Sequence, residues 1–396
     1  MLEKKIFFNG LNELRAFASL SVIFYHIEIL KSRDHTSSLF DNSFFTYFID
    51  RLGRNGVNLF FVLSGFLITY LLLKEKEKYE TILLRKFYLR RIFRIWPLYY
   101  LIVCISFVII PYLAITSDIF HNTPFNFIDI SNPENYSINS LLTYLFFLPN
   151  VAREYYGYRV VGGIQSWSVG VEEQFYILWP LLIFLFARKK IAWVFVLLLL
   201  IFIFSNVFIQ PASFHLLPKN ASFTAMLIPR IYVIIKIIPF EFMTIGAIGG
   251  YLYAYYDKKI KQFSKSKYIY LVVLSFVFIF LFLSLYHVYF QGLILGFLFL
   301  FLILVTINDE NTIVFRNKPI SYLGKISYGI YMYHPFVMFL VFPFANSYFN
   351  DSGTTLYYNL FVYVFVFSLT ILLSHFSYKY FESVFIKIKD TKYKSL

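Results

Sequence analysis

The first apolar stretch of this 396-residue chain carries the ionisable side chains of Arg15 and His26. Arg15 and His26 are eleven residues apart, about three helical turns, so both lie on one helix face ~16 Å apart along the axis. An ionisable group in a membrane span costs ~2.5–3.5 kcal/mol on insertion scales and is therefore a functional hypothesis. His26 could shuttle a proton near neutral pH, or it could only hydrogen bond to another helix. Arg15 could serve a ligand, or it could extend its charge to the cytoplasmic surface.

Three arginines, Arg90, Arg91 and Arg94, stand at the start of a later apolar run. Guanidinium groups bind phosphate through a planar bidentate fork, so this cluster suits a polyanionic ligand at the cytoplasmic side. Positive charges beside a span also fix its orientation, and this alternative would explain several of them. Arg94, which precedes Trp96 and Pro97, is the least easily explained by orientation alone.

A carboxylate, Glu172, enters another apolar run at its outer end. It could orient a catalytic histidine or accept a proton from a hydroxyl, or it could simply face water at a helix start, where the dipole favours acids. His334 lies inside a late apolar run, and its structural and functional interpretations both stay open. Because His35, His121 and His215 lie in predicted outer loops without the spacing of metal ligands, we predict no metal site.

The elements that must position these residues are predicted to be transmembrane helices. Hydrophobic residues make up 59% of the chain and charged residues 15%, whereas a soluble domain has roughly 25% charged residues. Runs long enough to cross a bilayer predict an all-α, polytopic membrane protein of about ten spans that forms one domain over residues 1–396. The spans are expected at 11–30, 56–73, 92–115, 168–187, 191–210, 231–256, 268–286, 289–307, 323–345 and 356–386. The outer segment 116–167 shows no strand or helix pattern of its own, and the apolar piece at 140–149 is too short to cross.

The distribution of positive charge orients these spans. A formal charge of +14 would suggest nucleic acid for a soluble protein, but here the Lys and Arg residues lie in short loops. If both termini are cytoplasmic, the inner segments hold 25 of the 36 Lys and Arg residues and the outer loops hold 7. This asymmetry predicts cytoplasmic termini and leaves no need for nucleic-acid binding.

Five segments in chain order resemble motifs of the membrane-bound acyltransferase family 3. They are the Arg15–His26 spacing, the run 56–69 with Ser64, the basic run 90–97, the run 167–176 with Glu172, and the run 326–335 with Tyr328 and His334. Members of this family acylate hydroxyl groups of carbohydrates and some other acceptors. Asn58 departs from the pattern, because many members have an aspartate there.

The resemblance implies an O-acyltransferase of the cytoplasmic (inner) membrane that takes an acetyl group from acetyl-CoA. The acceptor would be a hydroxyl of a surface glycan or of its lipid-linked precursor. The nucleotide end of coenzyme A would lie on Arg90, Arg91 and Arg94, with Arg15 on another polar group of the donor. His26 would act as general base or acyl carrier, and Glu172 would orient it. Ser64, Tyr328 and His334 are further candidates.

Two other classes of membrane protein remain as alternatives. A transporter or flippase would also explain about ten helices with buried charges, although the sequence has no internal repeat. A polysaccharide polymerase or ligase would need a large folded outer loop, whereas 116–167 is expected to be irregular. We expect no esterase-like soluble domain after the last predicted span. We therefore expect the protein to deliver the acyl group itself or to pass it to a separate extracytoplasmic protein.

Overall fold

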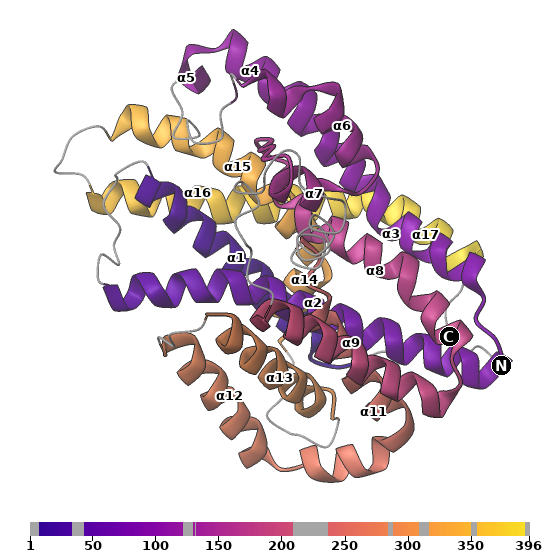
Figure 1. Cartoon of the computed structure of the whole chain (residues 1–396). Coiled ribbons are helices and arrows are strands. Elements are labelled where there is room, and N and C mark those ends of the chain that lie inside the picture. The colour runs from indigo at the N-terminus through magenta and orange to yellow at the C-terminus, as the bar shows by residue number, and fades with distance from the viewer. Residues whose placement is uncertain are drawn as a thin grey trace.

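The computed structural model of the chain describes residues 8–33, 43–121, 130, 132–208, 237–283, 288–308, 317–349 and 355–392. Within these ranges every regular element is a helix, so the predicted all-α fold is confirmed (Figure 1). The helices are α1 (Leu11–Arg33), α2 (Ser43–Tyr79), α3 (Leu84–Cys104), η1 (Ile105–Ile109), α4 (Ile110–Thr116), α5 (Asp118–His121), η3 (Pro133–Tyr136), α6 (Ile138–Leu145), α7 (Pro149–Glu154), α8 (Ser166–Leu185), α9 (Arg188–Phe208), α11 (Phe240–Ser264), α12 (Lys267–Phe282), α13 (Val288–Thr306), α14 (Lys318–Lys325), α15 (Ser327–Tyr348), α16 (Thr355–Phe376), η5 (Ser377–Glu382) and α17 (Ser383–Lys392).

The helices fit an integral membrane protein, and each predicted span overlaps at least one of them. Among the described residues, five helices are long and apolar enough to cross a membrane: Tyr47–Tyr79, Leu84–Thr116, Ser166–Leu185, Ser327–Tyr348 and Leu356–Lys392. The predicted spans 231–256 and 268–286 fall on α11 and α12, which meet at a 96° bend and give a sixth span if they are joined. The total of ten spans and the cytoplasmic termini stay predictions.

Close backbone contacts at small residues hold α1 and α2 in the middle of the fold, with α11–α13 on one side and α3, α6 and α8 on the other (Figure 1). A Cβ atom on Gly65 of α2 would lie 1.9 Å from the carbonyl oxygen of Met243 in α11. A Cβ atom on Gly324 of α14 would lie 1.7 Å from the carbonyl oxygen of Asn12, at the start of α1. Only glycine permits such approaches, which are typical of membrane helix pairs. The approach at Gly324 supports the turn of α1 that carries Arg15.

The outer segment 116–167 is more ordered than the sequence predicted. Its described part contains three short α-helices, α5, α6 and α7, and the 3₁₀ helix η3, so the expected lack of helices was wrong. These helices depend on tertiary contacts, since the Tyr99 and Tyr100 hydroxyls of α3 donate to the carbonyl oxygens of Tyr144 and Leu145 in α6. The apolar piece at 140–149 accordingly splits between α6 and the start of α7 rather than forming one helix.

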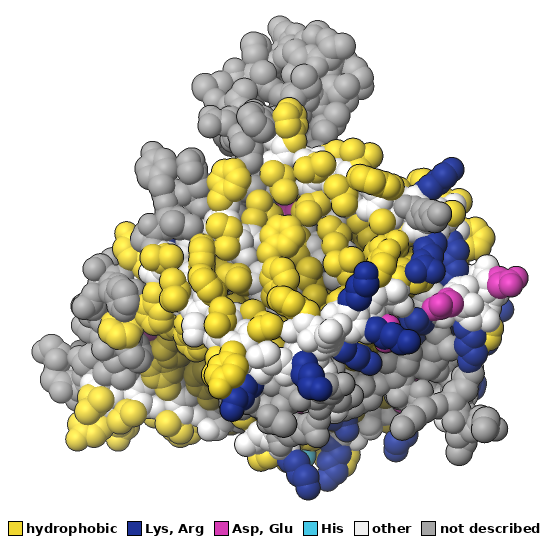
Figure 2. Space-filling model, turned by 90° about the horizontal axis from the view of Figure 1, so that it is seen from below, with side chains coloured by type: hydrophobic (Ala, Val, Ile, Leu, Met, Phe, Trp, Pro, Cys, Tyr) yellow, Lys and Arg dark blue, Asp and Glu magenta, His cyan; other side chains and the backbone are white. Residues whose placement is uncertain are grey.

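The surface has the polarity of a membrane protein. Figure 2 shows hydrophobic side chains over most of one face, with Lys and Arg side chains gathered along one margin. Exposed apolar residues recur along the long helices, including Leu185 of α8, Trp193 of α9 and Val364 of α16. A soluble protein rarely exposes contiguous apolar patches of this kind, whereas a lipid-facing surface requires them.

Candidate active site

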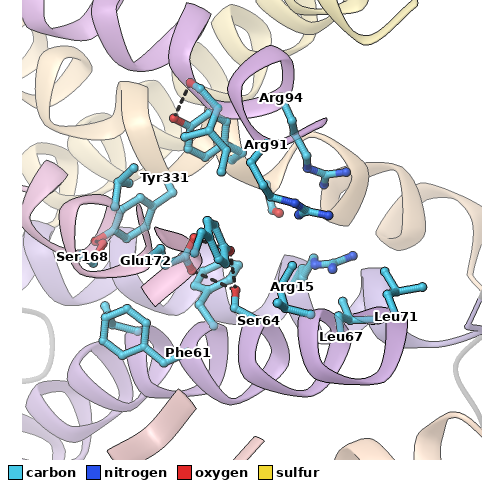
Figure 3. Close-up of a pocket in the computed structure, with 18 residues that line it drawn as sticks. Arg15, Phe61, Ser64, Leu67, Leu71, Arg91, Arg94, Ser168, Glu172 and Tyr331 are labelled. Atoms are coloured by element: carbon cyan, nitrogen blue, oxygen red, sulfur yellow. Dashed lines mark hydrogen bonds between the residues drawn. The ribbon is translucent and has the colours of Figure 1, made fainter. Parts of the chain in front are cut away.

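A cavity of about 210 Å³ lies among α1, α2, α3, α8 and α15 (Figure 3). We call it the arginine cavity, because the guanidinium groups of Arg15, Arg91 and Arg94 converge on it from α1 and α3. Its other walls come chiefly from Phe60, Phe61, Ser64 and Leu67 of α2, Ser168, Glu172 and Tyr176 of α8, and Tyr328 and Tyr331 of α15. Residues from all five sequence motifs therefore meet in or beside one cavity.

The arginine cavity has the charge of an anion site. Its described lining holds three cationic side chains, Arg15, Arg91 and Arg94, and one carboxylate, Glu172. Arg15 donates to the side-chain oxygen of Asn12 at 3.3 Å, and the Arg91 guanidinium lies 5.6 Å from the Tyr176 ring centroid. The Nε atom of Arg91 is buried without a hydrogen-bond partner among the described residues. Because a buried guanidinium donor normally finds an acceptor, this orphan fits a site that takes a phosphate-like anion.

Arg90 does not line the arginine cavity, although the sequence grouped it with Arg91 and Arg94. Its guanidinium is buried and donates to Glu75 at 2.9 Å, and the other Glu75 oxygen accepts from the backbone N–H of Leu83. Removing one partner of a buried ion pair typically costs ~3–5 kcal/mol. Arg90 thus ties the end of α2 to α3, and we leave it out of the ligand-binding set.

A carboxylate and two hydroxyls form a hydrogen-bonded group in the same cavity. Ser64 and Tyr176 donate to the two oxygens of Glu172 at 3.0 and 3.1 Å, and their own oxygens are 3.3 Å apart (Figure 3). The sequence had assigned Glu172 to the orientation of His26, but the structure places its hydrogen bonds on Ser64 and Tyr176 instead. Ser168, Glu172 and Tyr176 are spaced four residues apart on α8, so helical periodicity alone could have found the last member.

His26 lies instead against His334. Their rings are stacked with centroids 5.0 Å apart, and Nε2 of His334 lies 2.9 Å from Nδ1 of His26. His334 is fully buried and its Nδ1 is 2.6 Å from the backbone carbonyl oxygen of Tyr331. Pro335 explains this last contact, since it has no N–H with which to satisfy the Tyr331 carbonyl four residues before it. The sequence did not predict this pairing, because 308 residues separate the two histidines.

The Tyr331 carbonyl oxygen, which His334 contacts, fixes the direction of both hydrogen bonds. A carbonyl oxygen can only accept, so Nδ1 of His334 carries the hydrogen, and in the neutral ring Nε2 must be an acceptor. Nδ1 of His26 then donates to it, and in a neutral His26 ring Nε2 is the nitrogen that carries the lone pair. An imidazole held in this way can act chemically as a general base, with the second ring in the orienting position.

The arginine cavity reaches almost to the histidine pair. Tyr331 lines the cavity, and His334 follows it on α15 after three residues, slightly less than one helical turn. On α2, Val57 lines the cavity, and Gly53, one turn earlier, packs against Tyr25 beside His26. The level of the histidines is therefore about one turn, ~5 Å, beyond the cavity. The Tyr331 ring centroid lies 5.7 Å from that of His334, and the Tyr331 hydroxyl lies 2.7 Å from the Ser168 hydroxyl.

The other candidates from the sequence also lie around this site. Tyr328 lines the cavity and donates through its hydroxyl to the carbonyl oxygen of Ile95 in α3. Among the residues that the structure describes, no group of three or more His, Cys, Asp or Glu side chains could hold a metal ion. His35 and His215 lie outside the described residues.

Comparison with known proteins assigns the chain to a family. The acyltransferase 3 family, whose defining unit is described as an acyltransferase domain, matches residues 8–375. The chain belongs to the acyltransferase 3 family. A protein of Staphylococcus aureus (strain MRSA252) named "Putative O-acetyltransferase" is 27% identical over 99% of this chain and 60% of its own length. The O-acetyltransferase OatA of Staphylococcus aureus (strain NCTC 8325 / PS 47) is 25% identical over 94% of this chain and 56% of its own length.

The chain thus spans somewhat less than two thirds of the length of these relatives. No solved structure matches it significantly. Family membership confirms the resemblance that the five motifs carried, and it agrees with a site built from those motifs.

Proposed function

We propose that this protein is an O-acetyltransferase that moves an acetyl group from cytoplasmic acetyl-CoA to a hydroxyl of a glycan or of a lipid-linked glycan precursor. The observation that carries the proposal is that a candidate anion-binding site and a histidine pair lie next to each other. Three guanidinium groups that suit a phosphorylated donor line a cavity, and an oriented imidazole pair lies about one turn beyond its end. The names of the S. aureus relatives support transfer to oxygen.

In this proposal the arginine cavity binds the donor. Arg91 and Arg94 present their guanidinium groups from one face of α3, and Arg15 does so from α1. Their charges would hold phosphate oxygens, and the unpartnered Nε of Arg91 would gain an acceptor. Acetyl-CoA would supply an acetyl group already activated as a thioester. Glu172 offsets part of the positive charge and holds the Ser64 and Tyr176 hydroxyls in place.

His26 would do the proton chemistry. Its Nε2 lone pair would remove the proton from the acceptor hydroxyl as the hydroxyl oxygen attacks the acetyl carbonyl carbon, while Nδ1–H stays donated to His334. The thioester C–S bond would then break, and coenzyme A would leave as the thiol with the proton that Nε2 returns. The same lone pair would be the nucleophile if the acyl group is carried for a step on His26. His334 stabilises the orientation of the ring in either route, because its own hydrogen is held by the Tyr331 carbonyl.

The proposed setting is the cytoplasmic membrane, with both termini inside and the acceptor outside. The distribution of Lys and Arg supports this orientation. The acyl group would then cross the membrane within the protein, either straight to the glycan or to a separate extracytoplasmic protein that completes transfer.

The test is reconstitution of the purified protein in vesicles with acetyl-CoA labelled in the acetyl group. We expect alkali-labile label on an added glycan acceptor, at a rate that depends on the amount of protein. A transporter or flippase would translocate a glycan or lipid without forming an ester. Absence of ester from an active, correctly inserted preparation offered several glycan acceptors would favour that alternative.

A further inference from the structure

A second cavity, of about 470 Å³, adjoins the arginine cavity. Arg15, Leu67, Arg94 and Tyr328 line both, so the two cavities meet at a junction that carries two guanidinium groups. We call the second cavity the vestibule. Its volume is about twice that of the arginine cavity, so together they form a larger chamber joined to a smaller one.

Three short elements contribute to the walls of the vestibule. Lys325 comes from the last turn of α14, Tyr378 from the π-helix η5, and Lys389 from α17. π turns inside α-helices are frequent at functional sites, where they redirect side chains. The Lys325 ammonium lies 5.0 Å from the Tyr378 ring centroid, which places a cation and an aromatic face side by side on one wall.

The basic side chains of the vestibule outnumber its acids. Lys325 and Lys389 add to Arg15 and Arg94 of the junction, against Glu382 and Asp390. Lys389 is only 13% exposed and pairs with Asp390 at 3.2 Å, and Glu382 accepts from Ser377 at 3.0 Å. Both acids therefore have partners within the protein, and a bound phosphate would compete with Asp390 for Lys389.

We propose that the vestibule binds the 3′-phosphorylated adenosine of coenzyme A, with the 3′-phosphate on Lys325 and Lys389. The inference rests on the proposed function and adds the subsite for the nucleotide. A ligand with a large anionic head and a slimmer uncharged arm matches a larger basic chamber joined to a smaller cavity. The pyrophosphate then lies at the junction between Arg15 and Arg94, and the adenine has the face of Tyr378 for stacking.

The test measures binding to the purified protein in detergent, by calorimetry, with coenzyme A and with dephospho-coenzyme A, which lacks only the 3′-phosphate. We expect the wild type to prefer coenzyme A by ~10-fold, the usual size of a charge-assisted hydrogen-bond contribution. The double variant Lys325→Ala/Lys389→Ala should bind both ligands equally and should bind dephospho-coenzyme A as the wild type does. Lys387→Ala, which removes an exposed lysine of α17 that does not line the vestibule, is the matched control and should keep the preference.

Three outcomes would overturn the subsite. The wild type could show no preference, the double variant could retain it, or the double variant could lose affinity for both ligands by the same factor, as a general charge effect would. A wild-type protein that binds neither ligand would instead overturn coenzyme A as the donor, and the proposed function with it. Because the readout is binding, these failures can be told apart without an acyl-transfer assay.

Discussion

The orienting role of His334 gives the sharpest prediction on the site. His334→Ala removes the acceptor for Nδ1–H of His26 and leaves His26 itself in place. Loss of a general base typically lowers a rate ~10²–10⁴-fold, and loss of the partner that orients a metal-bound histidine, taken here as the nearest analogy, typically costs ~10–100-fold. We therefore expect acetyl transfer to fall ~10–100-fold in kcat with little change in the KM for acetyl-CoA. The assay is ester formation by the purified variant, together with its pH–rate profile.

The same substitution also affects stability, and the two effects can be separated. His334→Ala leaves the buried Tyr331 carbonyl without its donor, because Pro335 has no N–H, at a cost of about 1–3 kcal/mol. In the double variant His334→Ala/Pro335→Ala, the new N–H of residue 335 can donate to that carbonyl. We expect the double variant to regain thermal stability in detergent but not activity, and its pH–rate profile to stay shifted from that of the wild type. If activity returns together with stability, His334 is structural and the orientation argument is wrong.

Three further predictions test the donor site, the topology and the helix packing. Arg94→Ala should raise the KM for acetyl-CoA, and Arg94→Lys should restore the KM only in part because an ammonium lacks the bidentate fork. An unchanged KM in Arg94→Ala would show that Arg94 does not bind the donor and serves only to orient the span in the membrane. In a protein without its native cysteine, a cysteine at Glu134 should react with an impermeant thiol reagent outside intact cells, and one at Lys261 should not; the reverse would refute the predicted orientation. Gly65→Ala should lower the melting temperature strongly, since its Cβ would lie 1.9 Å from a backbone oxygen. Gly292→Ala should not, since the nearest atom to its Cβ would be a ring carbon of Phe242 at 3.5 Å; equal effects would contradict the packing account.

The membrane fold could be predicted from the sequence because apolar runs report directly on burial in lipid. Each predicted span overlaps a helix, although the π turns η1 and η5 have no signal in the apolar pattern. The short helices of 116–167 were missed for a physical reason. They are too short to be stable alone, and hydrogen bonds from α3 hold α6 in place.

The candidate site was predictable residue by residue but not as an arrangement. Arg15, Arg91, Arg94 and Glu172 were each singled out as unusual in an apolar run, and they share one cavity. Neighbouring helix residues point about 100° apart, so the sequence could not decide between Arg90 and Arg91 without knowing that Glu75 faces the former.

The sequence also could not predict which residues far apart in the chain contact each other. Nothing local to His26 indicates His334, and the one sequence signal that bears on the pair is Pro335. Its missing N–H leaves a carbonyl that the preceding histidine can satisfy.

The most direct test of the central claim is acetyl transfer by His26→Gln, measured as glycan-bound ester with the purified protein in vesicles at matched abundance. An amide can keep a hydrogen bond to His334 but cannot take the hydroxyl proton or carry the acyl group. His375→Gln is the control, because His375 is another helix histidine with a single described side-chain hydrogen bond, to Tyr322, and it lies in neither cavity. We predict at least ~10²-fold loss for His26→Gln and near wild-type activity for the control. Wild-type ester formation by His26→Gln would show that His26 is a structural hydrogen-bonding residue and would contradict the mechanism.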